Sequence, residues 1–233
     1  MYAKAVMNTA VVAVLPSTTV KQIAKILYEH RISAVPVIDK QERLVGIVSE
    51  GDLVFREELG TKSKQSWWLS LFEDTERRAH GYVKSHSTIA RDIMTTKVIS
   101  VTEETSVQQI ADLLERHQIK RVPVLRDNKV VGIVSRANLV QSLAIGANKT
   151  ESTDNTSTDL AIREELGKTL RSELGISTTP LNVIVEKGIV HIWGFVDGEQ
   201  ERRAIQIVAE GTEGVKQVDS RLILYSTIPA YGI

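Results

Sequence analysis

Two short stretches of this chain place a polar side chain where a strand is expected to end and a helix to begin. In the first, Gly46-Ile47-Val48-Ser49 leads to Asp52, whose carboxylate can accept hydrogen bonds from hydroxyl or N–H groups. In the second, 86 residues later, Gly132-Ile133-Val134-Ser135 leads to Asn138, which carries no charge. The two stretches therefore share a backbone pattern but differ in the one side chain best suited to bind a ligand.

A pair of cations lies before one of the expected strands. Lys120 and Arg121 directly precede Val122-Pro123, and the matching place in the first half of the chain holds Ser33 and Ala34. Cations at such a place can bind an anionic group, although a charged pair can equally be a solvated strand edge. The carboxylate and the cations thus occur in different halves of the chain.

An internal repeat relates these places and predicts the elements that position them. Residues 30–37 match residues 117–124 at an offset of 87, and the offset becomes 86 from Gly46 onward because one loop residue is lost. Each copy has a β-rich run, a helix with a capping-box start and an apolar stripe, two β-branched runs and a closing helix. The predicted order in each copy is β-α-β-β-α. The strand runs are 11–14, 35–38 and 44–49 in one copy, and 98–101, 122–125 and 130–135 in the other.

The helix, the h-x-V-P-V run and the G-h-V-S-x-x-D-L run together resemble the CBS domain, over about residues 1–58 and 89–146. Two copies in tandem resemble a Bateman module, so the resemblance implies an α/β (α+β) fold in which the repeats pack as a pseudo-twofold disc. It also implies a regulatory module that binds an adenine nucleotide (AMP, ADP or ATP) or S-adenosylmethionine. Modules of this family commonly form homodimers.

The same resemblance implies roles for particular residues. Asp52 would hold the ribose, with Ser49 beside it, and Lys120 and Arg121 before Pro123 would reach the phosphate from the other repeat. The matching cleft has Ser33, Ser135 and Asn138, lacks both the carboxylate and the cations, and is expected to be degenerate. One nucleotide per chain is therefore expected. The alternative is that Ser49 and Asp52 only cap a helix, whose first turn favours an acid.

Residues 59–88 separate the repeats and contain the adjacent pair Trp67-Trp68. Adjacent residues point about 100° apart on a helix, and the acids nearby offset much of the positive charge, so packing onto the module or a dimer mate is favoured over a membrane-surface helix. Residues 147–157 are rich in Thr, Ser, Asn and Asp, which predicts a flexible linker.

A third domain is predicted at 158–229 with the order α-β-β-α-β, including a hairpin about Lys187-Gly188. Residues 158–226 resemble the BON domain, a family associated with phospholipid membranes and envelope assemblies, so an unknown protein or phospholipid is its expected partner. This stretch has eight basic and eleven acidic residues, a net charge of −3, which gives electrostatic binding to anionic lipid little support. The segment Gly211-Thr212-Glu213-Gly214 is a poor match to an RNA-binding loop, and no nucleic-acid partner is expected.

Composition bounds the remaining possibilities. The 233 residues include 29 basic and 29 acidic side chains and no cysteine, so disulfides, thiolate metal sites and cysteine nucleophiles are excluded. No apolar run approaches the length of a transmembrane helix, and a cytoplasmic location is expected. No catalytic or metal-binding spacing is present, so an enzyme is not expected. The leading hypothesis is a nucleotide-sensing regulator, and the rival is a structural adaptor whose CBS pair only dimerises.

Overall fold

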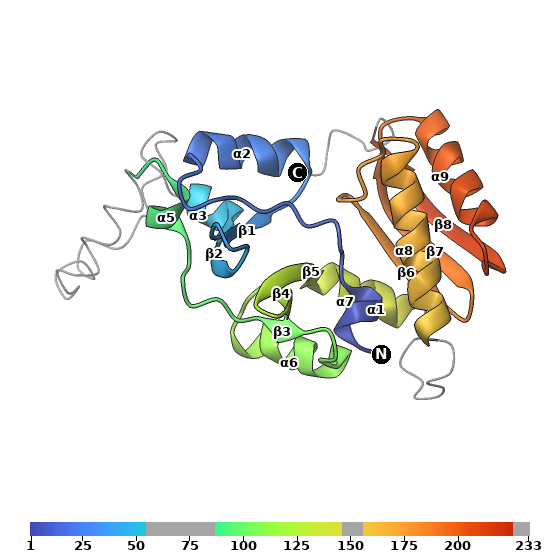
Figure 1. Ribbon diagram of the computed structural model, residues 1–233, viewed down its shortest axis with the longest axis horizontal. Coiled ribbons are helices and arrows are strands. Elements are labelled where there is room, and N and C mark those ends of the chain that lie inside the picture. Colours follow the sequence, from blue (N-terminus) through green and yellow to red (C-terminus); the bar gives the residue numbers. More distant parts are fainter. Residues whose placement is uncertain (55–86, 146–155, 226–233) are drawn as a thin grey trace. The chain divides into compact units, whose positions relative to one another are not determined.

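The computed structural model describes residues 1–54, 87–145 and 156–225 (Figure 1). Most of the predicted insert, 59–88, and of the predicted linker, 147–157, lies outside the described residues. Contacts divide the chain into two units. One contains Val12–Ile99 with Asp127–Val130, and the other contains Met1–Val11, Ser100–Arg126 and Val131–Ile233.

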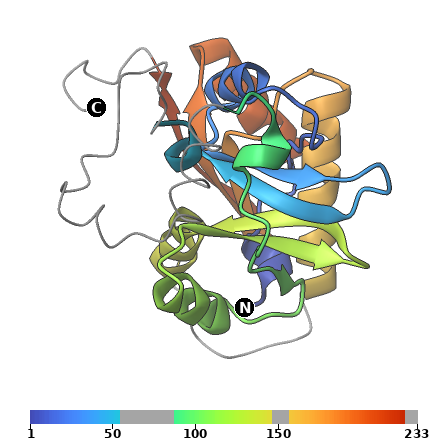
Figure 2. The ribbon, with the colours of Figure 1, turned by 90° about the vertical axis from the view of Figure 1, so that its left-hand side faces the viewer.

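The first repeat is built on an antiparallel pair of strands, β1 (Ala34–Ile38) and β2 (Leu44–Ser49) (Figure 2). Val35 lies opposite Val48 in this pair. Helix α2 (Val20–Glu29) begins with the predicted capping box and buries its apolar stripe on this pair. Helix α3 (Glu50–Val54) follows β2 directly. The buried cluster of the repeat contains Val14, Ile23, Leu27, Val35, Val37, Val48, Ala90 and Ile93.

The second repeat contains β3 (Val101–Thr102), α6 (Val107–Arg116), β4 (Arg121–Arg126), β5 (Lys129–Ser135) and α7 (Arg136–Ala144). Its sheet has the order β3-β4-β5, with β3 parallel to β4, which confirms the predicted β-α-β-β-α order. In the first repeat, the predicted opening strand is reduced to a single bridge between Val14 and Val37. Pro16 stands where the second repeat has Glu103, and proline has no N–H to extend the ladder.

Two four-residue helices that the sequence analysis did not predict precede the repeats, α1 (Ala3–Val6) and α5 (Ala90–Ile93). Each packs within the unit of the other repeat. The N–H of Ala3 donates to the carbonyl of Thr105 at 2.8 Å, and the N–H of Ala90 donates to the carbonyl of Thr18 at 2.8 Å. The segment before each repeat along the chain is therefore exchanged in space.

A methionine follows each short helix and lies over a glycine of the repeat against which that helix packs. A Cβ atom added at Gly132 would lie 2.4 Å from Sδ of Met7, and one added at Gly46 would lie 2.4 Å from Sδ of Met94. The methionine would have to shift to admit a side chain at such a distance. The repeated glycine of the G-h-V-S run is therefore required by packing against the exchanged segment.

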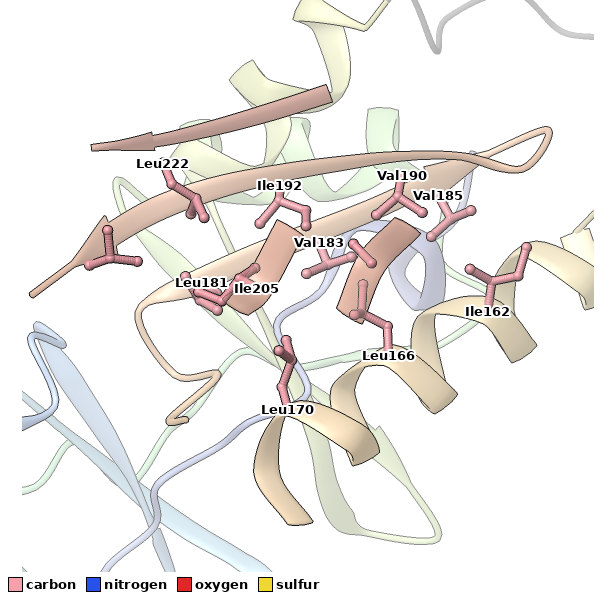
Figure 3. Packing of buried hydrophobic residues seen from close by; sticks show 12 residues of the cluster. Ile162, Leu166, Leu170, Leu181, Val183, Val185, Val190, Ile192, Ile205 and Leu222 are labelled. Atoms are coloured by element: carbon pink, nitrogen blue, oxygen red, sulfur yellow. The ribbon is translucent and has the colours of Figure 1, made fainter. Parts of the chain in front are cut away.

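The third domain contains α8 (Thr156–Ser172), β6 (Leu181–Glu186), β7 (Ile189–Val196), α9 (Glu199–Gly211) and β8 (Gln217–Leu224), which confirms the predicted α-β-β-α-β order. Its sheet has the order β6-β7-β8, with β6 antiparallel and β8 parallel to β7. Side chains of α8 and α9 pack on one face of this sheet (Figure 3). The core contains Ile162, Leu166, Leu170, Leu181, Val183, Val185, Val190, Ile192, Val196, Ile205, Ala209 and Leu222.

The predicted hairpin between β6 and β7 turns at Lys187 and Gly188, whose φ angles are 55° and 80°. Both values are positive, as a two-residue turn of this kind requires. The Asp159 side chain on α8 accepts hydrogen bonds from the N–H groups of Lys187 and Gly188 at 2.8 and 2.9 Å, which fastens the turn to the helix. Across the described residues, no helix combines the length and apolar character needed to cross a membrane.

Candidate functional site

Asp52 lies in the first turn of α3, directly after β2, and is half-buried. Its Oδ2 atom accepts hydrogen bonds from the N–H of Ser49 at 2.8 Å and from the hydroxyl of Ser49 at 2.9 Å. These contacts satisfy a backbone donor at the start of the helix, and an acid at this end is favoured by the helix dipole. The structure thus brings Ser49 and Asp52 together and gives the carboxylate a structural role.

Asn138 has the same position after β5 and makes the same contacts through an amide. Its Oδ1 atom accepts from the N–H and the hydroxyl of Ser135, both at 2.7 Å, and its own N–H donates to the Ser135 hydroxyl at 3.4 Å. The Asn138 side chain is buried, with 6% of the residue exposed. An uncharged oxygen therefore performs the capping role, so capping alone does not explain a negative charge at Asp52.

The residues before β1 and β4 lie beside these helix starts. The carbonyl of Ser33 accepts from the N–H of Glu50 at 3.1 Å, and the carbonyl of Lys120 accepts from the N–H of Arg136 at 3.1 Å. In the first repeat, Ser33 therefore contacts the first residue of the helix that carries Asp52. In the second repeat, Lys120 contacts the first residue of the helix that carries the uncharged Asn138.

The cation pair lies where β4 begins, with Lys120 just before the strand and Arg121 as its first residue. Lys120 is exposed, Arg121 is half-buried, and Pro123 is buried within the strand. Asp52 belongs to one unit of the chain and the pair to the other. The combination of the carboxylate with Lys120 and Arg121 in one nucleotide site stays a prediction, as does the degenerate cleft of Ser33, Ser135 and Asn138.

Sequence comparison assigns both kinds of domain. The CBS domain model matches residues 3–57 and 90–145. The chain belongs to the CBS-domain family. The BON domain model matches residues 158–224, so the same chain carries a C-terminal BON domain.

Relatives of known sequence resemble the CBS part of the chain. The CBS domain-containing protein CBSX1, chloroplastic, of Arabidopsis thaliana is 31% identical over 135 residues, which cover 55% of this chain and 57% of CBSX1. The uncharacterized protein MJ1426 of Methanocaldococcus jannaschii is 31% identical over 134 residues, covering 52% of this chain and 79% of that protein. The match thus spans little more than half the length of the plant relative.

A solved structure supports the same assignment. The crystal structure of CBSX2 in complex with AMP, a protein of Arabidopsis thaliana, is similar to this structure with a TM-score of 0.54 and 27% identity. The similarity covers 64% of this chain and 99% of the CBSX2 chain.

Proposed function

We propose that this chain is a non-enzymatic regulatory protein whose CBS pair binds one adenine nucleotide and signals to the BON domain. The observation that carries the proposal is the difference between Asp52 and Asn138. The two side chains make the same capping contacts, so the charge of Asp52 serves a purpose that capping does not supply. Family membership and the AMP complex of CBSX2 support an adenine nucleotide as that purpose.

In this proposal, the Asp52 carboxylate accepts the ribose hydroxyls, and Lys120 and Arg121 from the other repeat pair with phosphate. Ser49 holds the carboxylate in place from the end of β2. AMP is the first ligand to test, with ADP, ATP and S-adenosylmethionine after it. The BON domain is proposed to bind a protein or phospholipid partner, and the CBS pair to form a homodimer. The cytoplasmic location stays a prediction.

One observation favours the rival function of a structural adaptor. The hydrogen bonds from Ser49 support a role for Asp52 at the start of α3. In an adaptor, the CBS pair would only dimerise, and the charge of Asp52 would serve the helix dipole.

The substitution Asp52→Asn separates the two functions, because asparagine performs the capping role at the matching position in the second repeat. We expect its unfolding temperature to stay within a degree or so of the wild type, since the expected change in stability is a few tenths of a kcal/mol. We expect its affinity for AMP, measured by calorimetry, to fall by about 1.5–3 kcal/mol, or roughly tenfold to 150-fold.

The matched control is Asp112→Asn, which makes the same change at an exposed position of α6 and should leave AMP affinity unchanged. Equal affinity of the wild type and Asp52→Asn would refute the assignment of Asp52 to the ribose. If the wild-type protein binds none of the four ligands, the adaptor becomes the better description.

A further inference from the structure

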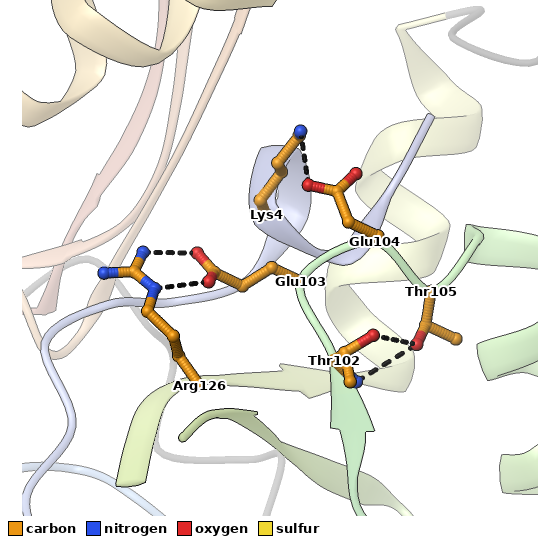
Figure 4. A network of polar contacts seen from close by, with 6 residues as sticks. All are labelled: Lys4, Thr102, Glu103, Glu104, Thr105 and Arg126. Atoms are coloured by element: carbon orange, nitrogen blue, oxygen red, sulfur yellow. Dashed lines mark hydrogen bonds and ion pairs between the residues drawn. The ribbon is translucent and has the colours of Figure 1, made fainter. Parts of the chain in front are cut away.

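The N-terminal segment, residues 1–8, is held to the second repeat by charged and backbone contacts (Figure 4). Lys4 Nζ lies 2.7 Å from Glu104 Oε1, and the N–H of Lys4 donates to the carbonyl of Glu103 at 3.1 Å. The Glu103 carboxylate in turn accepts two hydrogen bonds from the Arg126 guanidinium, at 2.6 and 2.7 Å. One side of the segment thus packs against the second repeat.

The other side of the segment contacts the BON domain through a buried guanidinium. Arg163 on α8 donates from one nitrogen to the carbonyl of Lys4 at 2.7 Å and from another to the carbonyl of Met7. These carbonyls lie at the end of α1, where a cation is favoured by the orphan acceptors and the helix dipole. Burial lowers the pKa of Arg163 to about 10, so its side chain remains charged at neutral pH.

Asn8 makes a second connection between the segment and the BON domain. Its Nδ2 donates to the carbonyls of Thr179 and Leu181 at 2.8 and 3.0 Å. The matching residue before the other repeat is Thr95, which forms the same backbone bridge, to Ile47, that Asn8 forms to Ile133. The exchanged packing therefore does not require an amide at this position. Both of these hydrogen bonds from the Asn8 amide nitrogen go to the BON domain.

On the outer face of the BON sheet, which is the face opposite α8 and α9, residues near these contacts are buried and residues far from them are exposed. On β6, Ile184 is 0% exposed and Asn182 is buried with its amide bonded to Gln141 of α7. Helix α1 packs against both β6 and α7. On the same face, Phe195 of β7 and Ile223 of β8 are 39% and 49% exposed. The segment and the second repeat thus cover the β6 side of the face and leave the β8 side open.

We propose that residues 1–8 are a docking segment that holds the BON domain against the second repeat and covers the β6 side of its sheet. Any partner that needs the whole outer face of the sheet must displace this segment. The docking rests on contacts within the chain and does not depend on nucleotide binding. It also provides a direct path from β5, which the segment bridges at Ile133, to the BON sheet.

Paramagnetic broadening in the full chain tests the docking. The chain has no cysteine, so a nitroxide can be attached at one place by Leu143→Cys, on an exposed position of α7. In otherwise wild-type protein, the label should broaden the amide signals of β6 more strongly than those of α9, on the other face of the sheet. Asn8→Thr with Arg163→Gln removes four hydrogen bonds and should shift the docked-to-undocked ratio by roughly 30-fold or more, sharpening the β6 signals.

Asn8→Thr alone provides a check that leaves the BON core untouched, because Asn8 lies outside the BON domain. Threonine is also the residue found at the matching place before the other repeat. Arg171→Gln is the matched control on α8, since Arg171 bonds to Thr178 inside the BON domain, and it should leave the broadening unchanged. The proposal is overturned if the β6 and α9 signals are broadened equally in the starting protein. It is also overturned if the double variant, with its BON signals still dispersed, keeps the β6 signals fully broadened.

Discussion

The two CBS repeats preserve the same packing but differ at several positions where a side chain could bind a ligand or another domain. The exchanged short helices make matching hydrogen bonds, and a Cβ atom added at either repeated glycine would lie at the same distance from a methionine sulfur. By contrast, Asp52 corresponds to Asn138, Ser33 to Lys120, and Thr95 to Asn8. The glycines that are the same in both copies are explained by packing, whereas the differences at Asp52, Lys120 and Asn8 are not required by the packing that the repeats share.

The largest predicted effects concern a position that is the same in both repeats. Gly46→Ala and Gly132→Ala each place a Cβ atom 2.4 Å from a methionine sulfur and 3.1 Å from the Cβ of the same methionine. We expect each to lower the free energy of unfolding by about 1–3 kcal/mol, the range for overpacking a core. Chemical denaturation of the full chain measures both values.

The comparison predicts that the two costs agree, because the two surroundings agree. Met94→Ala should relieve Gly46→Ala without relieving Gly132→Ala, since Met94 covers only the first glycine. If one glycine tolerates alanine at no cost while the other does not, the repeats are not equivalent in packing and the first half of the comparison is wrong.

A smaller effect tests a position that differs. If Lys120 and Arg121 pair with phosphate, replacing both with alanine should weaken AMP binding more than adenosine binding, because adenosine has no phosphate. We expect a difference of roughly tenfold, or about 1.4 kcal/mol, by calorimetry. Arg116→Ala, at an exposed position of α6, is the control and should affect neither ligand. An equal loss for AMP and adenosine would show that the pair does not contact phosphate.

Much of the fold follows from local signals that the repeat doubles. The capping boxes at Thr19 and Ser106 and the stripes of α2 and α6 occur as predicted, because their causes lie within one turn of chain. The same holds for the BON hairpin, which is fixed by two residues with positive φ. The missing first strand at Val14 was also within reach of the sequence, since Pro16 is visible there and Glu103 stands at the matching place.

Other features depend on contacts between distant residues, which local patterns do not contain. The exchange of α1 and α5 between the repeats could not be predicted. The two repeats offer matching contacts to a short helix, so the local sequence does not say which repeat each helix packs against. Arg163 is one of several charged residues of α8, and only the structure shows that it is buried against the carbonyls of Lys4 and Met7. For the candidate site, the sequence indicated Asp52 and Asn138, but not that both make the same cap.

The smallest predicted effect lies where Pro16 and Glu103 occupy matching positions. Both carbonyls accept a hydrogen bond from the exchanged segment, from Arg91 in one repeat and from Lys4 in the other. Only Glu103 adds a side chain to this contact, through its two bonds to Arg126, and its side chain is 18% exposed. The second repeat therefore has an ion pair at this position, whereas proline at the matching position of the first repeat cannot form one.

Glu103→Gln tests what this ion pair contributes. The hydrogen bond from Arg126 is the main cause that holds the pKa of Glu103 below its ordinary value of 4.5. A carboxyl group whose pKa is lowered in the folded state stabilises that state above its ordinary pKa, and the stabilisation is lost as the pH falls through the lowered value. We therefore expect Glu103→Gln to lower the free energy of unfolding by about 1 kcal/mol at neutral pH. The difference from the wild type should be constant from pH 7 to about pH 5 and shrink below pH 4.5, as denaturation at a series of pH values would show.

Glu104→Gln, which breaks the more exposed pair with Lys4, should cost about half as much or less. A cost for Glu103→Gln that persists unchanged at pH 3 would mean that shape rather than charge matters at this position, and the ion pair would then not distinguish the second repeat from the first.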